Sequence, residues 1–187
     1  LAAVNQNGLA KFRLAEWLSR EDNQSISLEA KQQRYALIKQ LYRGAVKDGV
    51  KDAELPLAFY EATSKKSKNR EWASQIANHY AAEGKVEAML LLGLMNEYAQ
   101  GNGRAARVWF EKAKDHPIGA FIWASYENDP LLKQALLEKS AKADFPYAYL
   151  NLAILKQQQN LSPFEDLQKA VELQNRSASH LLANLMI

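Results

Sequence analysis

A chain of 187 residues with 48% hydrophobic and 24% charged residues has the composition of an ordinary folded domain, which excludes an intrinsically disordered chain. Its 24 Lys and Arg against 21 Asp and Glu give a net charge of +3, which permits an acidic partner without requiring one. The absence of cysteine excludes disulfides, thiolate catalysis and cysteine metal sites. No apolar run approaches the roughly 20 residues that span a bilayer.

A recurring alanine phrase predicts the first helix of each of six repeats. An Ala is followed four residues later by Leu and then by a small residue, as in Ala88, Leu92 and Gly93. Residues i and i+4 share one helix face, and the small residue beside them allows a second helix to approach closely. The marker alanines are Ala10, Ala53, Ala88, Ala120, Ala148 and Ala178, at intervals of 43, 35, 32, 28 and 30 residues. The copy at Ala120 is the weakest, since Ala124 and Ser125 stand where Leu and Gly are expected.

A second phrase, with apolar residues followed by polar and then small ones, predicts the second helix of each hairpin. It occurs at 41–45, 109–113, 137–141 and 167–171, and polar loops at 21–25, 63–68, 100–103, 128–130 and 160–163 separate the two helices. Ser27, Asn69 and Ser162 are expected to cap the helices that follow. We therefore expect about eleven helices, essentially no strand, and one solenoid domain over 1–187, with repeats at 5–48, 49–83, 84–115, 116–143, 144–173 and 174–187.

These phrases carry a resemblance to a known family. Ala88, Leu92 and Gly93, followed by Trp109-Phe110 and Lys112-Ala113, resemble the Sel1-like repeat, a relative of the tetratricopeptide repeat. The resemblance implies an all-α, right-handed superhelical solenoid that acts as a protein–protein interaction scaffold or adaptor through its concave surface. It further implies a bacterial envelope, secretion or motility complex as the setting.

The candidate partner-binding positions lie two and six residues after each marker alanine, on one helix face beside the packing stripe. In the four central repeats these positions are apolar, whereas the end repeats carry polar residues such as Glu16 and Asn184. The central positions are Leu55, Phe59, Leu90, Leu94, Ile122, Tyr126, Leu150 and Ile154. They form an apolar groove for a helix or segment of another protein if they line the concave face, and they are core residues if the superhelix is tight.

The sequence selects no catalytic residue, cofactor site or metal site. His79, His116 and His180 lack metal-ligand spacing, and no pair of carboxylates stands out. The basic cluster 65–70 is either a solvated loop or an anionic contact. The alternatives are an RNA-binding helical-repeat protein, which the apolar groove positions disfavour, and a non-catalytic helical domain of a larger enzyme.

The two ends of the chain carry further expectations. The chain begins at Leu1 rather than Met, so we expect a trimmed or mature form, with the compartment open and the periplasm favoured over the cytoplasm. The last segment has Leu181, Leu182, Leu185, Met186 and Ile187 without a second helix after them. We expect that the chain either continues beyond them or associates with itself there.

Overall fold

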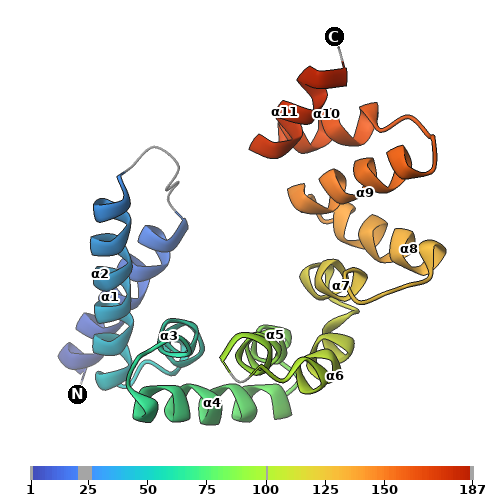
Figure 1. Ribbon diagram of the computed structural model, residues 1–187. Coiled ribbons are helices and arrows are strands. Elements are labelled where there is room, and N and C mark those ends of the chain that lie inside the picture. Colours follow the sequence, from blue (N-terminus) through green and yellow to red (C-terminus); the bar gives the residue numbers. More distant parts are fainter. Residues whose placement is uncertain (1, 21–26, 100, 186–187) are drawn as a thin grey trace. The chain divides into compact units, whose positions relative to one another are not determined.

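The computed structural model describes residues 2–20, 27–99 and 101–185, and this part of the chain is all-helical (Figure 1). It contains eleven α-helices and two short helical turns, with no strand among these residues. Within each of its two compact units, consecutive helices pack on one another, and the described residues confirm the expected all-α class and helix number. The chain divides into two compact units, Leu1–Met95 and Asn96–Ile187. A single solenoid over 1–187 stays a prediction.

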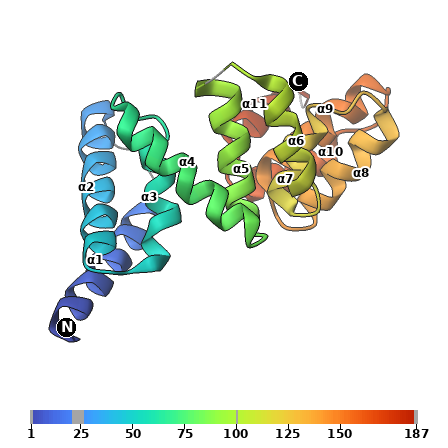
Figure 2. The ribbon, with the colours of Figure 1, turned by 90° about the horizontal axis from the view of Figure 1, so that it is seen from below.

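The first unit contains five α-helices in its described part. They are α1 (Ala2–Arg20), α2 (Leu28–Lys47), α3 (Glu54–Glu61), α4 (Ser67–Ala82) and α5 (Val86–Leu94), with a 3-10 turn η1 (Lys51–Ala53) before α3. The helices α1 and α2 lie side by side in both views (Figure 2). Phe12, Ile38, Tyr42 and Leu57 form the core between α1, α2 and α3 with buried alanines.

Capping chemistry explains the helix ends of the first unit. Ser27 caps α2 as expected, since its Oγ accepts a hydrogen bond from the Ala30 N–H at 3.2 Å. Gly49 has φ +86°, and the Val50 N–H donates to the Ala45 carbonyl, which ends α2 in a left-handed cap that glycine favours. Asn69 is not the cap of α4, because that helix begins two residues earlier, at Ser67. Its side chain serves another purpose, described below.

The second unit contains six α-helices in its described part. They are α6 (Gly103–Ala113), α7 (Pro117–Ala124), α8 (Pro130–Ala141), α9 (Pro146–Gln158), α10 (Phe164–Glu172) and α11 (Arg176–Leu185). A π-helical turn, η2 (Met95–Ala99), precedes them. Proline opens α7, α8 and α9, where its missing N–H costs no hydrogen bond. At α10 the helix starts one residue later than expected, with Pro163 as its N-cap residue.

The marker alanines show how the helices pack. Five of the six, Ala53, Ala88, Ala120, Ala148 and Ala178, are completely buried. The first marker is wrong: Ala10 is exposed and Leu14 is 45% exposed, whereas Phe12 and Ala15 face the core. The buried stripe of α1 is therefore displaced from the stripe that the alanine phrase predicts.

Candidate functional site

The eight predicted partner-binding residues differ in exposure. Phe59 and Ile154 are each 37% exposed, whereas Leu90 and Leu150 are buried. The other four, Leu55, Leu94, Ile122 and Tyr126, are partly buried. Leu150 belongs to the core of the second unit, where it packs with Leu167, Ala170 and Ala178.

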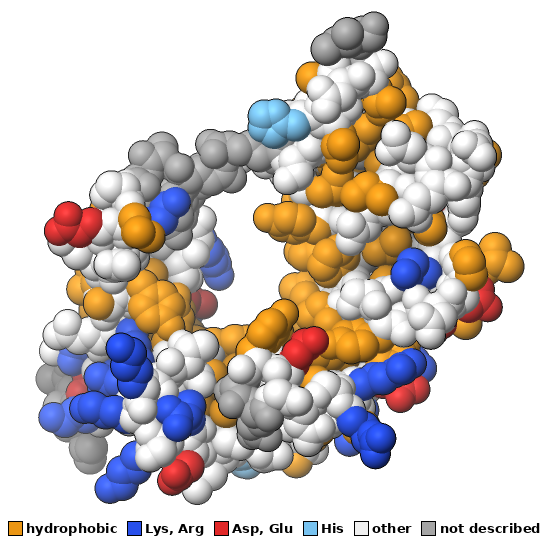
Figure 3. All heavy atoms as spheres, in the orientation of Figure 1, with side chains coloured by type: hydrophobic (Ala, Val, Ile, Leu, Met, Phe, Trp, Pro, Cys, Tyr) orange, Lys and Arg blue, Asp and Glu red, His pale blue; other side chains and the backbone are white. Residues whose placement is uncertain are grey.

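The second unit has an apolar groove at its last three helices. Hydrophobic side chains gather over α7, α9 and α11 (Figure 3). Between α9, α10 and α11 lies a cavity of about 250 Å³. It is lined by Ala153, Ile154, Gln157, Pro163, Leu167, Leu181, Asn184 and Leu185. The groove thus combines Ile154 with Leu181 and Leu185, while Met186 and Ile187 lie outside the described residues.

Tyr126 is held inside the second unit rather than presented to a ligand. Its hydroxyl donates to the Glu97 carboxylate at 2.6 Å, and its ring lies 5.6 Å from Phe110 and 6.1 Å from Trp123. Burial raises the pKa of Tyr126 to about 12, and the bond to Glu97 adds to the shift. The side chain that the sequence assigns to a groove is thus engaged in contacts within its own unit.

The first unit contains a cleft of about 700 Å³. We call it the tyrosine cleft. Its lining comes from α1, α2, η1, α3, α4 and the start of α5, and consists of Ser19, Tyr42, Lys51, Asp52, Leu55, Pro56, Phe59, Tyr60, Tyr80, Lys85 and Glu87. Two predicted residues, Leu55 and Phe59, lie in this cleft, whereas Leu90 and Leu94 are not part of its lining.

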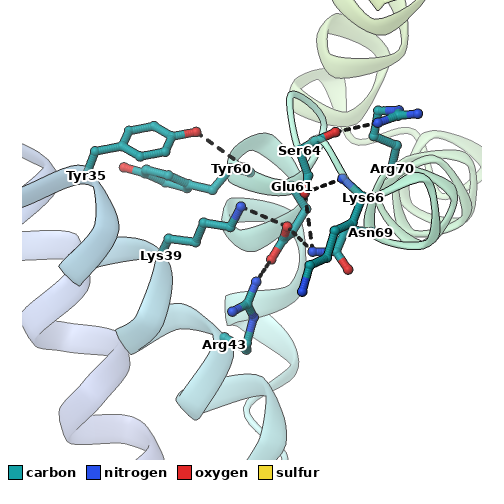
Figure 4. A network of polar contacts seen from close by, with 9 residues as sticks. All are labelled: Tyr35, Lys39, Arg43, Tyr60, Glu61, Ser64, Lys66, Asn69 and Arg70. Atoms are coloured by element: carbon teal, nitrogen blue, oxygen red, sulfur yellow. Dashed lines mark hydrogen bonds and ion pairs between the residues drawn. The ribbon is translucent and has the colours of Figure 1, made fainter. Parts of the chain in front are cut away.

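Aromatic rings packed at tilted angles support one wall of the tyrosine cleft. The Tyr60 ring centroid lies 5.8 Å from that of Tyr42 and 4.8 Å from that of Tyr35, and Tyr42 packs in turn on Phe12 at 6.1 Å. The Tyr35 hydroxyl donates to the Tyr60 carbonyl at 3.3 Å (Figure 4). Burial raises the pKa values of the Tyr42 and Tyr60 hydroxyls, so both are protonated donors at neutral pH. The wall is apolar, with hydroxyl groups that can donate hydrogen bonds.

Tyr80 also lines the tyrosine cleft and is fixed by polar contacts. Its hydroxyl shares its one proton between two acceptors, the Glu54 carboxylate at 3.0 Å and the Lys51 carbonyl at 3.3 Å. The ammonium group of Lys85 lies 4.2 Å from the ring centroid, within the range of a cation–π contact. Burial raises the pKa of Tyr80 to about 12, helped by Glu54. These bonds tie α4 to η1 and α3, so the cleft is bounded by side chains already in place.

A buried carboxylate that sequence reasoning missed fixes α3 between its neighbours. Glu61 is only 3% exposed at its side chain, and it pairs with Lys39 at 2.8 Å and with Arg43. The side-chain amide of Asn69 donates to the same carboxylate at 2.7 Å (Figure 4). Lys39 and Arg43 come from α2 and Asn69 from α4, so one carboxylate links three helices. The only sequence signal is a Glu at the end of an otherwise apolar stretch, 55–62.

The pKa of Glu61 reflects a competition. Burial raises the pKa of this carboxyl, but hydrogen bonds from Lys39, Arg43 and Asn69 stabilise the charged form and together bring the pKa below its ordinary 4.5. Glu61 is therefore ionised at neutral pH. It acts as a structural anion that orients α3, whose other side lines the tyrosine cleft.

Two of the three histidines make local contacts. His116 caps α7, its Nδ1 accepting a hydrogen bond from the Ile118 N–H at 3.3 Å, and His79 lies 3.5 Å from Glu83. Among the described residues, no three His, Asp or Glu side chains are grouped as metal ligands would be. No helix in that same part of the chain is both long and apolar enough to cross a bilayer.

Comparison with known proteins gives no family assignment. Neither a protein-family model nor a curated protein sequence matches this chain. The resemblance to the Sel1-like repeat therefore rests on the residues of the repeat phrases alone.

Proposed function

We propose that this chain is a protein-interaction scaffold or adaptor that binds a segment of a partner protein in the tyrosine cleft. The single observation that carries the proposal is the cleft itself: about 700 Å³, lined by Leu55, Phe59 and three tyrosines. Ligand-binding clefts fall in the same size range and have mainly apolar linings with a few placed polar groups. Tyrosine is enriched at interfaces because it offers a large ring together with a hydrogen-bonding hydroxyl.

The exposure of Phe59 supports this reading. An aromatic ring that is 37% exposed beside the partly buried Leu55 offers apolar area to a partner, and neither residue belongs to the hydrophobic core. Lys51, Asp52, Lys85 and Glu87 surround these rings with charges of both signs. A peptide that places an apolar side chain on Phe59 and polar groups at this rim fits the cleft.

The wider setting of the proposal comes from the Sel1-like resemblance. That resemblance supports an adaptor in a bacterial envelope, secretion or motility complex, with the periplasm favoured over the cytoplasm. The proposal includes no catalytic step, cofactor or metal. A helical domain attached to a larger enzyme is the alternative, and the same cleft would serve that enzyme as a docking site.

Peptide display tests the proposal directly. A library of random peptides is selected on the wild-type chain, and the enriched peptides are measured against Phe59→Asp and against Trp17→Asp. Trp17 is 58% exposed on α1 and lies outside the cleft, so its variant has a matched change in charge and hydrophobicity. We expect peptides with an apolar anchor, whose binding is lost in Phe59→Asp and kept in Trp17→Asp.

Circular dichroism of both variants completes the test. Retained helicity in Phe59→Asp together with lost binding supports the interaction role. Unfolding of Phe59→Asp, with Trp17→Asp folded, would show that Phe59 is a core residue. Equal binding by the two variants would remove the tyrosine cleft as the binding site.

A further inference from the structure

The excess positive charge of the chain lies in its first unit. Residues 96–187 carry equal numbers of basic and acidic side chains, so the whole net charge of +3 belongs to residues 1–95. Within this unit, Lys39, Arg43 and Lys47 follow one another at four-residue intervals along α2 and therefore share a helix face. Lys and Arg side chains gather at the lower left of the space-filling view, where the first unit lies (Figure 3). This unit thus has a basic face.

A small cavity opens on the same side of α2. It measures about 260 Å³ and is lined by Arg43, Val46, Lys47, Leu57, Glu61, Asn69 and Trp72. We call it the basic notch. Leu57 follows Leu55 by two residues, and Glu61 follows Phe59 by two residues. In a helix with 3.6 residues per turn, two residues correspond to a rotation of about 200° around the axis. The basic notch and the tyrosine cleft therefore lie on different sides of α3.

The walls of the basic notch combine apolar surface with unneutralised charge. Val46 and Trp72 are partly buried apolar side chains at the notch, and they flank the buried Leu57. Glu61 carries one negative charge there, but Lys39 and Arg43 both pair with it, which leaves one positive charge over. The notch itself is thus an apolar recess with a cationic rim.

Further cations lie at the notch or close to it in the sequence. Lys47 lines it, and Lys65, Lys66 and Lys68 lie in the segment that leads to Asn69 on its edge. All four lysines are exposed, and none of them forms an ion pair with another residue in the described part of the chain. Arg70 differs, because its guanidinium donates to the Ser64 carbonyl and closes the turn between α3 and α4 (Figure 4). The backbone of Lys66 caps α4, but among the described residues the charged side chains of the four lysines form no ion pair that holds the turn.

We propose that the basic notch binds an acidic segment of a partner protein that carries one large apolar side chain. The apolar side chain fills the recess between Val46, Leu57 and Trp72, and carboxylates on either side of it meet Lys47 and the lysines of 65–68. A volume of about 260 Å³ accommodates a single side chain of this kind. The shape of the recess favours a protein side chain over a nucleobase, because bases stack on exposed aromatic faces, whereas Trp72 is partly buried and lies beside the aliphatic Val46 and Leu57. This site is separate from the tyrosine cleft, and the proposal stands whether or not that cleft binds a peptide.

A labelled peptide tests this directly. The probe is a fluorescein-labelled 11-residue peptide of Glu and Asp with a single central Phe, and its binding is followed by fluorescence anisotropy. Two further probes of equal length serve as controls. One is the same peptide with Ala in place of Phe, and the other is oligouridylate. We expect the Phe peptide to bind most tightly, the Ala peptide to bind about tenfold more weakly, and the affinity of both to fall with added salt.

Charge-reversed variants locate the binding. Lys47→Glu/Lys66→Glu is compared with Lys31→Glu/Lys142→Glu, which makes the same change in net charge at exposed lysines elsewhere. We expect the first pair to weaken binding of the Phe peptide about tenfold or more and the second by about twofold or less. Both variants are checked for an unchanged melting temperature. Phe59→Asp, which disables the tyrosine cleft, is expected to bind the probe as the wild type does.

Four outcomes would overturn the proposal. They are no measurable binding of the Phe peptide, equal binding of the Phe and Ala peptides, equal losses in the two charge-reversed variants, and tighter binding of oligouridylate than of either peptide. The second would reduce the site to a general attraction between opposite charges. The fourth would assign the basic face to a nucleic acid.

Discussion

Gly119 is the position where a single methyl group has the clearest expected effect. It is buried in the first turn of α7, directly after the turn that leads from α6. A Cβ atom added there would lie 1.9 Å from the Ala113 carbonyl oxygen and 2.5 Å from its carbon. These are backbone atoms, and the same carbonyl already accepts a hydrogen bond from the His116 N–H at 2.9 Å. The methyl group therefore cannot be accommodated by rotating a side chain.

Two effects of opposite sign compete in Gly119→Ala. In an unobstructed helix the change stabilises the fold by about 0.5–1 kcal/mol, because alanine loses less backbone entropy on folding. Forcing a methyl group into a filled contact costs about 1–3 kcal/mol, and the overlap here is severe enough to reach the upper end of that range. We expect a net loss of about 2 kcal/mol, which lowers the melting temperature by roughly 4–8 °C in a chain of this length.

Gly103→Ala provides the matched control. An added Cβ at Gly103, the first residue of α6, meets no atom within 4 Å. This variant is expected to be as stable as the wild type or up to about 1 kcal/mol more stable. Thermal and urea unfolding of the three proteins, followed by circular dichroism, measure the difference. A Gly119→Ala variant at least as stable as Gly103→Ala would refute the close approach of α6 and α7.

Three further predictions concern other parts of the chain. Glu61→Gln should lose about 1–3 kcal/mol in urea unfolding at pH 7. Because the pKa of Glu61 is lowered in the folded state, the wild type should lose this advantage as the pH falls below about 4.5, until the two proteins converge. Gly93→Leu should cost about 1–3 kcal/mol, since Gly93 is buried in α5; an unchanged melting temperature contradicts that. If the C-terminal helix mediates self-association, Leu185→Lys should convert an oligomer into a monomer in light scattering, and a monomeric wild type argues against such association.

Local signals in the sequence mark some of the helix boundaries. Gly49 and Gly84 mark the ends of α2 and α4 because both adopt positive φ values, which cost other residues energy. The second unit shows the limit of this rule. There α8, α9 and α10 are followed by Asp144, Asn160 and Gln174 at φ of 56° to 64°, and these residues carry weaker signals than glycine.

The register of α1 was not predictable from its own residues. Ala10 with Leu14 and Phe12 with Ala15 both satisfy helical periodicity, so the partner helix decides which pair is buried. Gly8 shows how it decides, because a Cβ there would lie 2.7 Å from the Cβ of Asp48 at the end of α2. This close approach directs Phe12 and Ala15 to the core and leaves Leu14 exposed. A long-range contact of this kind leaves no trace in a local phrase.

Only those residues of the candidate site that come from one helix could be predicted from the sequence. Leu55 and Phe59 follow from the spacing within α3, whereas Tyr42 and Tyr80 reach the tyrosine cleft from α2 and α4. The same spacing within a repeat also assigns Leu150 to an open surface, although this residue is buried. It occupies the position in α9 that Leu55 occupies in α3, but α10 and α11 cover it. The position of a residue within a repeat therefore predicts which side of the helix it lies on. The neighbouring helices determine whether that side is exposed or buried.

Glu61 gives the eight-residue α3 its importance in the first unit. Leu55 and Phe59 face the tyrosine cleft, Leu57 and Glu61 face the basic notch, and Ala58 is completely buried. A helix of eight residues has little stability of its own, so its orientation depends on contacts with α2 and α4. A fully apolar contact would also hold α3, but it would allow rotation among several similar packings. The carboxylate of Glu61, held by Lys39, Arg43 and Asn69 from two different helices, satisfies its bonds in one orientation only, and that orientation fixes both surfaces at once.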